Sequence, residues 1–354
     1  MENKSNPQQL VSETIDLIRF PMAVFVVFIH TCSTNINVND TTYPIYQFLR
    51  ALFSNIIASV AVPTFFIISG YLFYKHLENW NWDSYYEKLK QRVKTLFVPY
   101  LLWNSMYIVF ALSGAIYSVL MKRASYTVLS DWFNSEGMCS LYWGNPYPYL
   151  VPLWYIRDLM IIVLFAAIIY WFTKKMHFVL LIIAYSLFLK YDVSLASSVF
   201  YFSLGALFQI DNGRLRHLDN RNIRYLIIII YVLLLCMKII GLYVDLNYSE
   251  IFNKLYLIIG PMAVLCVGYE LAINGWKISI KLLVNSSFFV YVFHYFLIYY
   301  IPLILRYIMG DDSQLILILV YFSSTFTIVC MSVFLYSLLN RYTPFLMKVL
   351  MGGR

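Results

Sequence analysis

Charged residues are scarce in this chain: Asp, Glu, Lys and Arg make up only 12% of its 354 residues, whereas 61% are hydrophobic. A soluble domain carries roughly twice that share of charge, so a cytosolic globular enzyme is excluded. Glycine (13) and proline (11) are also few, which excludes collagen-like and low-complexity chains. The five cysteines show no spacing typical of a metal or redox site, and we expect no metal cofactor.

Long apolar runs and aromatic residues fill the chain instead. Aromatic residues make up 19% of it, and the mean hydropathy is +0.69. A bilayer core of about 30 Å needs roughly 20 apolar residues per helical crossing. The sequence therefore predicts an all-α, polytopic membrane protein, a single integral-membrane domain over residues 1–354. Ten runs are the expected spans: 12–32, 47–74, 95–121, 150–172, 177–190, 195–211, 223–243, 252–273, 282–308 and 314–339.

The net charge of +8 is spread over the loops rather than gathered on one face, so nucleic acid is not an expected partner. Most Lys and Arg residues fall in the loops on one side of the ten-helix bundle. The positive-inside rule then predicts that both termini are cytoplasmic. We expect a multi-pass protein in the plasma (inner) membrane of a bacterium, with membrane lipids around it.

Two loops have distinctive compositions. Residues 75–94 mix Trp and Tyr with Lys and Glu, which is typical of an interfacial cytoplasmic segment. Residues 122–149 form an aromatic-rich loop on the opposite, extracytoplasmic side. Its rings could stack on a sugar, but Trp and Tyr also collect at any membrane interface, and the interfacial role is favoured.

Ionisable side chains inside the spans are functional candidates, because each costs on the order of 2.5–3.5 kcal/mol to insert. Arg19 and His30 lie 11 positions apart in the first run, which at about 100° per residue places both on one helix face. A cation and an imidazole on one face suit an anionic ligand and a proton transfer. The alternative is an Arg that reaches the headgroups and a His that hydrogen-bonds between helices.

The ninth run presents a second candidate face. Ser287, Tyr291 and His294 follow one another at helical spacing and must point into the bundle. Arg157 and Asp158 are adjacent in the fourth run and so lie about 100° apart, which favours partners on other helices over a direct pair. Glu270, in the eighth run, is a further intramembrane candidate.

Six stretches of the chain resemble, in order, those of a known family. They are RFPMAVFVVFIH (Arg19 to His30), PTFFIISGYLF (with Pro63, Phe65, Phe66, Ser69 and Gly70), QRVKTLFVPYLLW (with Arg92, Pro99 and Tyr100), PLWYIRDL (with Trp154 and Tyr155), FSLGALF (with Gly205) and SSFFVYVFHYF (with His294). The family is the membrane acyltransferase 3 family, and the resemblance covers residues 12 to about 300. One departure is that the family often has a further Arg before the Pro-Tyr pair, where this chain offers Lys94 and Thr95.

The resemblance implies an acyl-CoA-dependent O-acyltransferase, most often an acetyltransferase, in which His30 and Arg19 are needed for acyl transfer. Acetyl-CoA is the expected donor, and the acceptor is a hydroxyl of an extracytoplasmic glycan or lipid-linked sugar. On this hypothesis His30 is the general base, with a transient acyl carrier as the alternative role, and Ser287, Tyr291 and His294 donate hydrogen bonds to the oxyanion. The expected binding residues are Arg19, Arg92 and Lys94 for the donor's phosphates, and Trp154, Tyr155 and Arg157 for the acceptor.

The alternative function is a transporter or flippase that uses intramembrane His and Arg as a relay. Release of CoA by the purified protein distinguishes the enzyme from the transporter. The sequence leaves two further choices open. The protein either modifies its glycan directly or passes the acyl group to a separate extracytoplasmic transferase, and the acceptor itself is not specified.

Overall fold

The computed structural model describes residues 7–31, 43–75, 81–122, 140–144, 147–190, 194–210, 220–244, 249–276, 281–310 and 313–353. All regular elements in these ranges are helical, which confirms the all-α prediction. The chain forms two compact units: unit 1 is residues 1–79 and 167–337, and unit 2 is residues 80–166 and 338–354.

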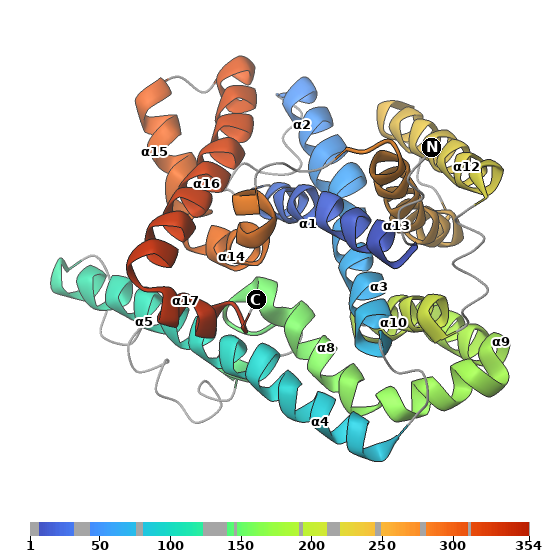
Figure 1. Ribbon diagram of the computed structural model, residues 1–354. Coiled ribbons are helices and arrows are strands. Elements are labelled where there is room, and N and C mark those ends of the chain that lie inside the picture. The colour runs from blue at the N-terminus through green and yellow to red at the C-terminus, as the bar shows by residue number, and fades with distance from the viewer. Residues whose placement is uncertain are drawn as a thin grey trace. The chain divides into compact units, whose positions relative to one another are not determined.

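Unit 1 is a helical bundle that contains both predicted histidines. Its helices are α1 (Pro7–Thr31), α2 (Pro44–Arg50), η1 (Ala51–Ile57), η2 (Ala58–Val60), α3 (Ala61–Tyr74), α9 (Ala166–Lys190, from its second residue), α10 (Ser194–Ile210), α12 (Arg221–Val244), α13 (Glu250–Ile273), α14 (Lys281–Leu297), α15 (Tyr300–Met309) and most of α16 (Gln314–Tyr342). Helix α1 lies between α13 and α14 and packs against both (Figure 1). It also packs against η1 and α3, so its side chains are largely enclosed by unit 1.

Helices α3 and α10 pack closely against each other in unit 1, and two glycines permit this approach. A Cβ atom on Gly70 would stand 2.1 Å from the carbonyl oxygen of Phe202, and one on Gly205 would stand 2.0 Å from that of Ile67. The two backbones therefore touch directly, as small residues allow in membrane helices. Both glycines belong to the short stretches that resemble the acyltransferase family.

A π-helical segment, η1, follows α2, leads through η2 to α3 and packs on α1. The hydroxyl of Ser54 donates to the carbonyl oxygen of Phe28 at 2.6 Å and lies 2.7 Å from the hydroxyl of Tyr321 on α16. Thr325, one turn along α16, donates to the hydroxyl of Thr31 at 3.2 Å. These polar contacts fix η1 and α16 against the end of α1 that carries His30.

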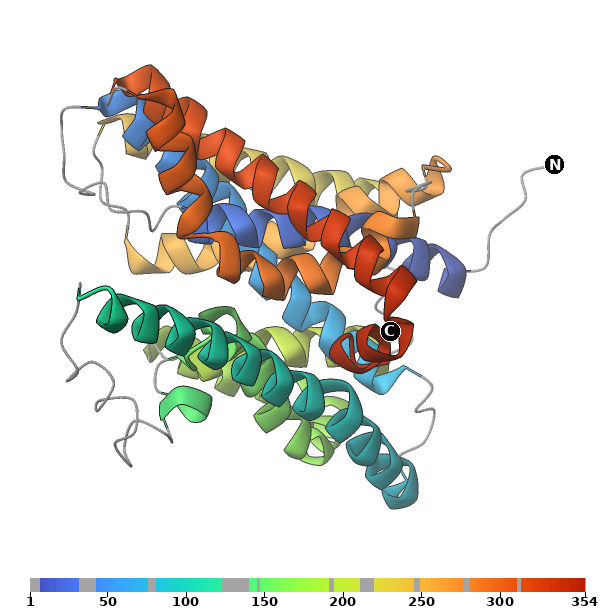
Figure 2. The same ribbon diagram turned by 90° about the vertical axis from the view of Figure 1, so that its left-hand side faces the viewer.

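Unit 2 consists of α4 (Trp82–Arg92), η3 (Val93–Phe97), α5 (Val98–Leu120), η4 (Val151–Leu153), α8 (Trp154–Leu164) and α17 (Pro344–Leu350), with the last residues of α16. Figure 2 shows α4, η3 and α5 as one long helix. Trp103 on α5 is fully buried and donates to the carbonyl oxygen of Leu350 at 3.0 Å. The C-terminal helix is thereby attached to α5.

Five helices in the described part of the chain are long and apolar enough to cross a membrane, or seven if two bent helix pairs each count as one span. Two of the predicted runs are divided differently. The run 282–308 breaks between α14 and α15 with a bend of 61°. The run 150–172 is broken where α8 stops at Leu164 and α9 begins at Ala166. Helix α9 is itself kinked at Met176, close to the predicted boundary between the runs 150–172 and 177–190. The predicted interfacial segment 75–94 contains α4, while much of the 122–149 loop lies outside the described residues.

Candidate active site

The two predicted histidines meet in unit 1. The ring centroids of His30 on α1 and His294 on α14 lie 5.2 Å apart, with the ring planes inclined by 34°. His294 is completely buried. Two helices far apart in the sequence thus bring two imidazoles together, an arrangement that can accept, hold and pass on a proton.

A tyrosine that the sequence analysis did not select completes this cluster. Tyr295 meets the ring of His30 edge-on at 5.6 Å and that of His294 at 6.2 Å. It directly follows His294 and so does not share the helical spacing of the predicted face, which is why the pattern did not include it. We call His30, His294 and Tyr295 the histidine cluster.

The predicted face of α14 does point into the bundle. Ser287, Tyr291 and His294 are 7%, 4% and 0% exposed. The hydroxyl of Ser287 donates to carbonyl oxygens of its own helix, at 2.8 Å to Val284. Tyr291 packs edge-on against Phe65 of α3, with the ring centroids 6.1 Å apart. This contact joins two of the stretches that resemble the family, so the face is enclosed by other helices of unit 1.

Arg19 lies on the same α1 face as His30, about 16 Å away along the axis at about 1.5 Å per residue. The helix continues unbroken through Pro21 between them. Arg19 reaches Asp16 at 3.4 Å, and the two side chains are 38% and 50% exposed. An exposed pair of this length contributes little to stability. The guanidinium can therefore exchange Asp16 for a more strongly bound anion.

Unit 2 holds the other predicted binding residues. Arg92, at the end of α4, lies within electrostatic reach of Tyr155 on α8 and of Lys88, whereas Lys94 on η3 is exposed. A residue predicted for the donor and one predicted for the acceptor are therefore neighbours. Trp154 begins α8 and contacts the half-exposed ring of Tyr147, with the centroids 6.5 Å apart.

The expectation that Arg157 and Asp158 have separate partners is wrong. Two nitrogens of Arg157, Nε and an Nη, donate to one carboxylate oxygen of Asp158 at 3.1 and 2.9 Å, and the other Nη donates to the carbonyl oxygen of Gly144 at 2.5 Å. The arginine side chain is long enough to turn back across the 100° between neighbouring positions. Both residues are buried, at 7% and 1% exposed. The pair fixes the segment around Gly144 to α8.

Other buried charges also have protein partners. Glu270 on α13 pairs with Arg224 on α12 at 2.8 Å, and Arg224 lies over the ring of Tyr269. These contacts explain the partly buried charge of Glu270, which links α12 to α13. Arg50, which the sequence analysis did not select, is 3% exposed at the end of α2.

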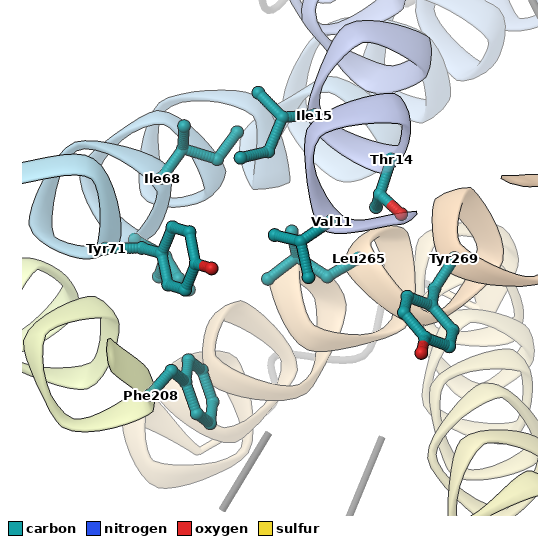
Figure 3. A pocket seen from close by; sticks show the side chains of 9 residues that line it. Val11, Thr14, Ile15, Ile68, Tyr71, Phe208, Leu265 and Tyr269 are labelled. Atoms are coloured by element: carbon teal, nitrogen blue, oxygen red, sulfur yellow. The ribbon is translucent and has the colours of Figure 1, made fainter. Parts of the chain in front are cut away.

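A pocket of about 450 Å³, counting its open mouth, lies at the other end of α1. Figure 3 shows its walls, which are mainly apolar side chains with the phenols of Tyr71 and Tyr269. Ile15 lines it and precedes Arg19 by one helical turn. The residues that line the pocket include no Lys, Arg or His. No group of three or more metal-ligating side chains occurs in the ranges that the structure describes.

The apolar helices define a multi-pass membrane protein in which α1 and α14 bring His30 and His294 together. Comparison with known proteins specifies the class. Residues 13–337 match the family model described as "Acyltransferase domain", and the chain belongs to this acyltransferase 3 family.

The succinoglycan biosynthesis protein ExoH of Rhizobium meliloti (strain 1021) is 25% identical over 366 residues, covering 97% of this chain and 93% of ExoH. No solved structure matches the chain. The protein is accordingly a multi-pass membrane protein of an acyltransferase family.

Proposed function

We propose that the protein transfers an acyl group, acetyl in the first place, from acyl-CoA on the cytoplasmic side to a hydroxyl of an extracytoplasmic glycan or lipid-linked sugar. The observation that carries this proposal is the contact between His30 and His294 in unit 1. His30 lies on the α1 face that also bears Arg19. The relative from Rhizobium meliloti is named for succinoglycan biosynthesis, which supports a polysaccharide acceptor.

In the reaction, the acceptor hydroxyl oxygen attacks the carbonyl carbon of the thioester. His30 takes the hydroxyl proton as the new C–O bond forms. The tetrahedral intermediate then breaks its C–S bond, and the departing CoA sulfur takes the proton back from His30. Donor and acceptor have then exchanged one acyl group for one proton, and the enzyme is unchanged.

The donor needs cations for its phosphates, and Arg19 is the cation available on the His30 face. Its partner Asp16 holds it through a long, exposed contact only. About 16 Å between Arg19 and His30 leaves room for the extended arm that joins the phosphates of CoA to its thiol.

Purified protein in detergent or proteoliposomes, supplied with acetyl-CoA and a glycan acceptor, tests the proposal. We expect free CoA thiol and O-acetylated glycan in equal amounts, and at least 100-fold less of both products from His30→Ala. A His30→Ala protein that is folded and transfers acetyl at the wild-type rate would refute the role of His30. Transport of a sugar substrate without release of CoA would support a transporter instead.

A further inference from the structure

His294 has one ring nitrogen engaged and one without a partner. Its Nδ1 lies 3.1 Å from the carbonyl oxygen of Val290, one turn back along α14. A carbonyl oxygen only accepts hydrogen bonds, so Nδ1 carries the proton of the neutral imidazole. Nε2 is then left with a lone pair. This atom is buried and has no hydrogen-bond partner in the part of the chain that the structure describes.

A buried acceptor without a donor is costly, so such an atom needs a physical reason. The side chain of His294 is 0% exposed, and bulk water does not reach it. Among the described residues, its ring neighbours include His30, on α1, and Tyr295, which meets both imidazoles edge-on. The orphaned nitrogen therefore belongs to the histidine cluster.

The spacing of the two imidazoles suits a hydrogen bond between them. Two rings joined by an N–H···N bond of about 3 Å have their centroids about 5 Å apart. The centroids of His30 and His294 are 5.2 Å apart.

We propose that His294 is a positioning residue for His30: its Nε2 accepts the N–H of His30 during acyl transfer. A neutral imidazole has one N–H and one lone pair. When its N–H faces His294, the lone pair of His30 faces away from α14, toward the acceptor hydroxyl. After His30 takes the hydroxyl proton, Nε2 of His294 stabilises the resulting imidazolium. The inference rests on the proposed function and assigns a role to the second histidine.

The role of oxyanion donor for His294 requires a proton on Nε2. Nδ1 would then carry a lone pair 3.1 Å from the lone pairs of the Val290 oxygen. Two acceptors at this distance repel each other, whereas the tautomer with Nδ1–H forms a hydrogen bond. The backbone of α14 thus favours His294 as an acceptor.

Two substitutions of similar size distinguish the roles of Nδ1 and Nε2 of His294. The side-chain amide of His294→Gln reaches the position of Nε2, and that of His294→Asn reaches the position of Nδ1. The Gln variant keeps an acceptor for His30, and the Asn variant keeps only the bond to Val290. We expect kcat to fall less than tenfold in His294→Gln and about 100-fold in His294→Asn, in line with the contribution of a positioned proton acceptor.

The KM for acetyl-CoA should stay at the wild-type value in both variants, because the donor's phosphates are held elsewhere. Equal losses of kcat in the two variants, or a wild-type kcat in His294→Asn, would overturn the inference. A wild-type protein that transfers no acyl group would count against the proposed function instead.

The tautomer can be measured without any activity. In ¹⁵N-histidine-labelled protein, the resonances that disappear in His294→Gln belong to His294. We expect a protonated Nδ1 and an unprotonated Nε2, each with its characteristic ¹⁵N shift. A protonated Nε2 would refute the inference whether or not the protein is an active transferase.

Discussion

The close contact between α3 and α10 makes Gly205→Ala a sharp test of the fold. The added Cβ would stand 2.0 Å from the Ile67 oxygen, and Cβ contacts under 3.0 Å essentially do not occur, so the backbones must separate by at least 1.0 Å. The neighbour is backbone and cannot rotate away. Overpacking of this kind costs about 1–3 kcal/mol, while Ala in place of Gly gains about 1 kcal/mol in helix propensity.

We therefore expect Gly205→Ala to lower the thermal denaturation temperature in detergent by a few degrees. Activity should fall as well, because α3 carries Phe65, which packs against Tyr291 beside the histidine cluster. Gly114→Ala is the matched control, since a Cβ at Gly114 meets nothing within 4 Å. Its stability should equal or exceed that of the wild type. If Gly205→Ala and Gly114→Ala denature at the same temperature, the reasoning about the α3–α10 contact is refuted.

Two further predictions concern charged groups. Arg19→Ala should raise the KM for acetyl-CoA at least tenfold with a smaller change in kcat, because it removes a phosphate contact far from the reacting carbon; steady-state kinetics measure both, and an unchanged KM would contradict the assignment. Asp158→Asn leaves the Arg157 charge buried and should destabilise the protein by about 3 kcal/mol or more. Thermal denaturation in detergent measures the loss, with the exposed Asp16→Asn as the control. We expect Asp158→Asn to lower the stability and Asp16→Asn to leave it unchanged. Equal stability of the two variants would contradict the role of the buried pair.

The helical architecture could be predicted because apolar runs of bilayer length are rare outside transmembrane helices. The shared face of Arg19 and His30 followed from spacing alone, since helical geometry fixes it. The inward direction of Ser287, Tyr291 and His294 followed from their polarity in an apolar run and is confirmed by their burial.

The helix breaks were harder to locate. The run 282–308 is apolar throughout, so its hydropathy gives no sign that α14 ends at Leu297. Pro302 is the available signal, because its ring nitrogen cannot donate to the carbonyl one turn earlier, at Ile298. No comparable residue marks the break after Leu164, where Phe165 adopts backbone angles of −101° and 8° outside the helical range.

Contacts between helices that are far apart in the chain could not be predicted from the sequence. The meeting of His30 with His294 depends on the packing of α1 against α14, 264 positions apart in the chain, and no local pattern encodes it. The direct pair of Arg157 and Asp158 was missed for another reason. Helical geometry gives the direction of Cβ, while a long side chain can return to a neighbour that its Cβ points away from.

The most direct test of the proposed chemistry is a single measurement of acyl transfer with His30 changed. Purified wild-type protein and His30→Ala, both verified as folded by size-exclusion chromatography, receive labelled acetyl-CoA and glycan, and the label on the glycan is counted. We expect the label on glycan exposed to the wild type and a loss of at least 100-fold with His30→Ala, the contribution of a general base. Equal labelling by the two proteins would show that the imidazole on α1 does not take part in the reaction.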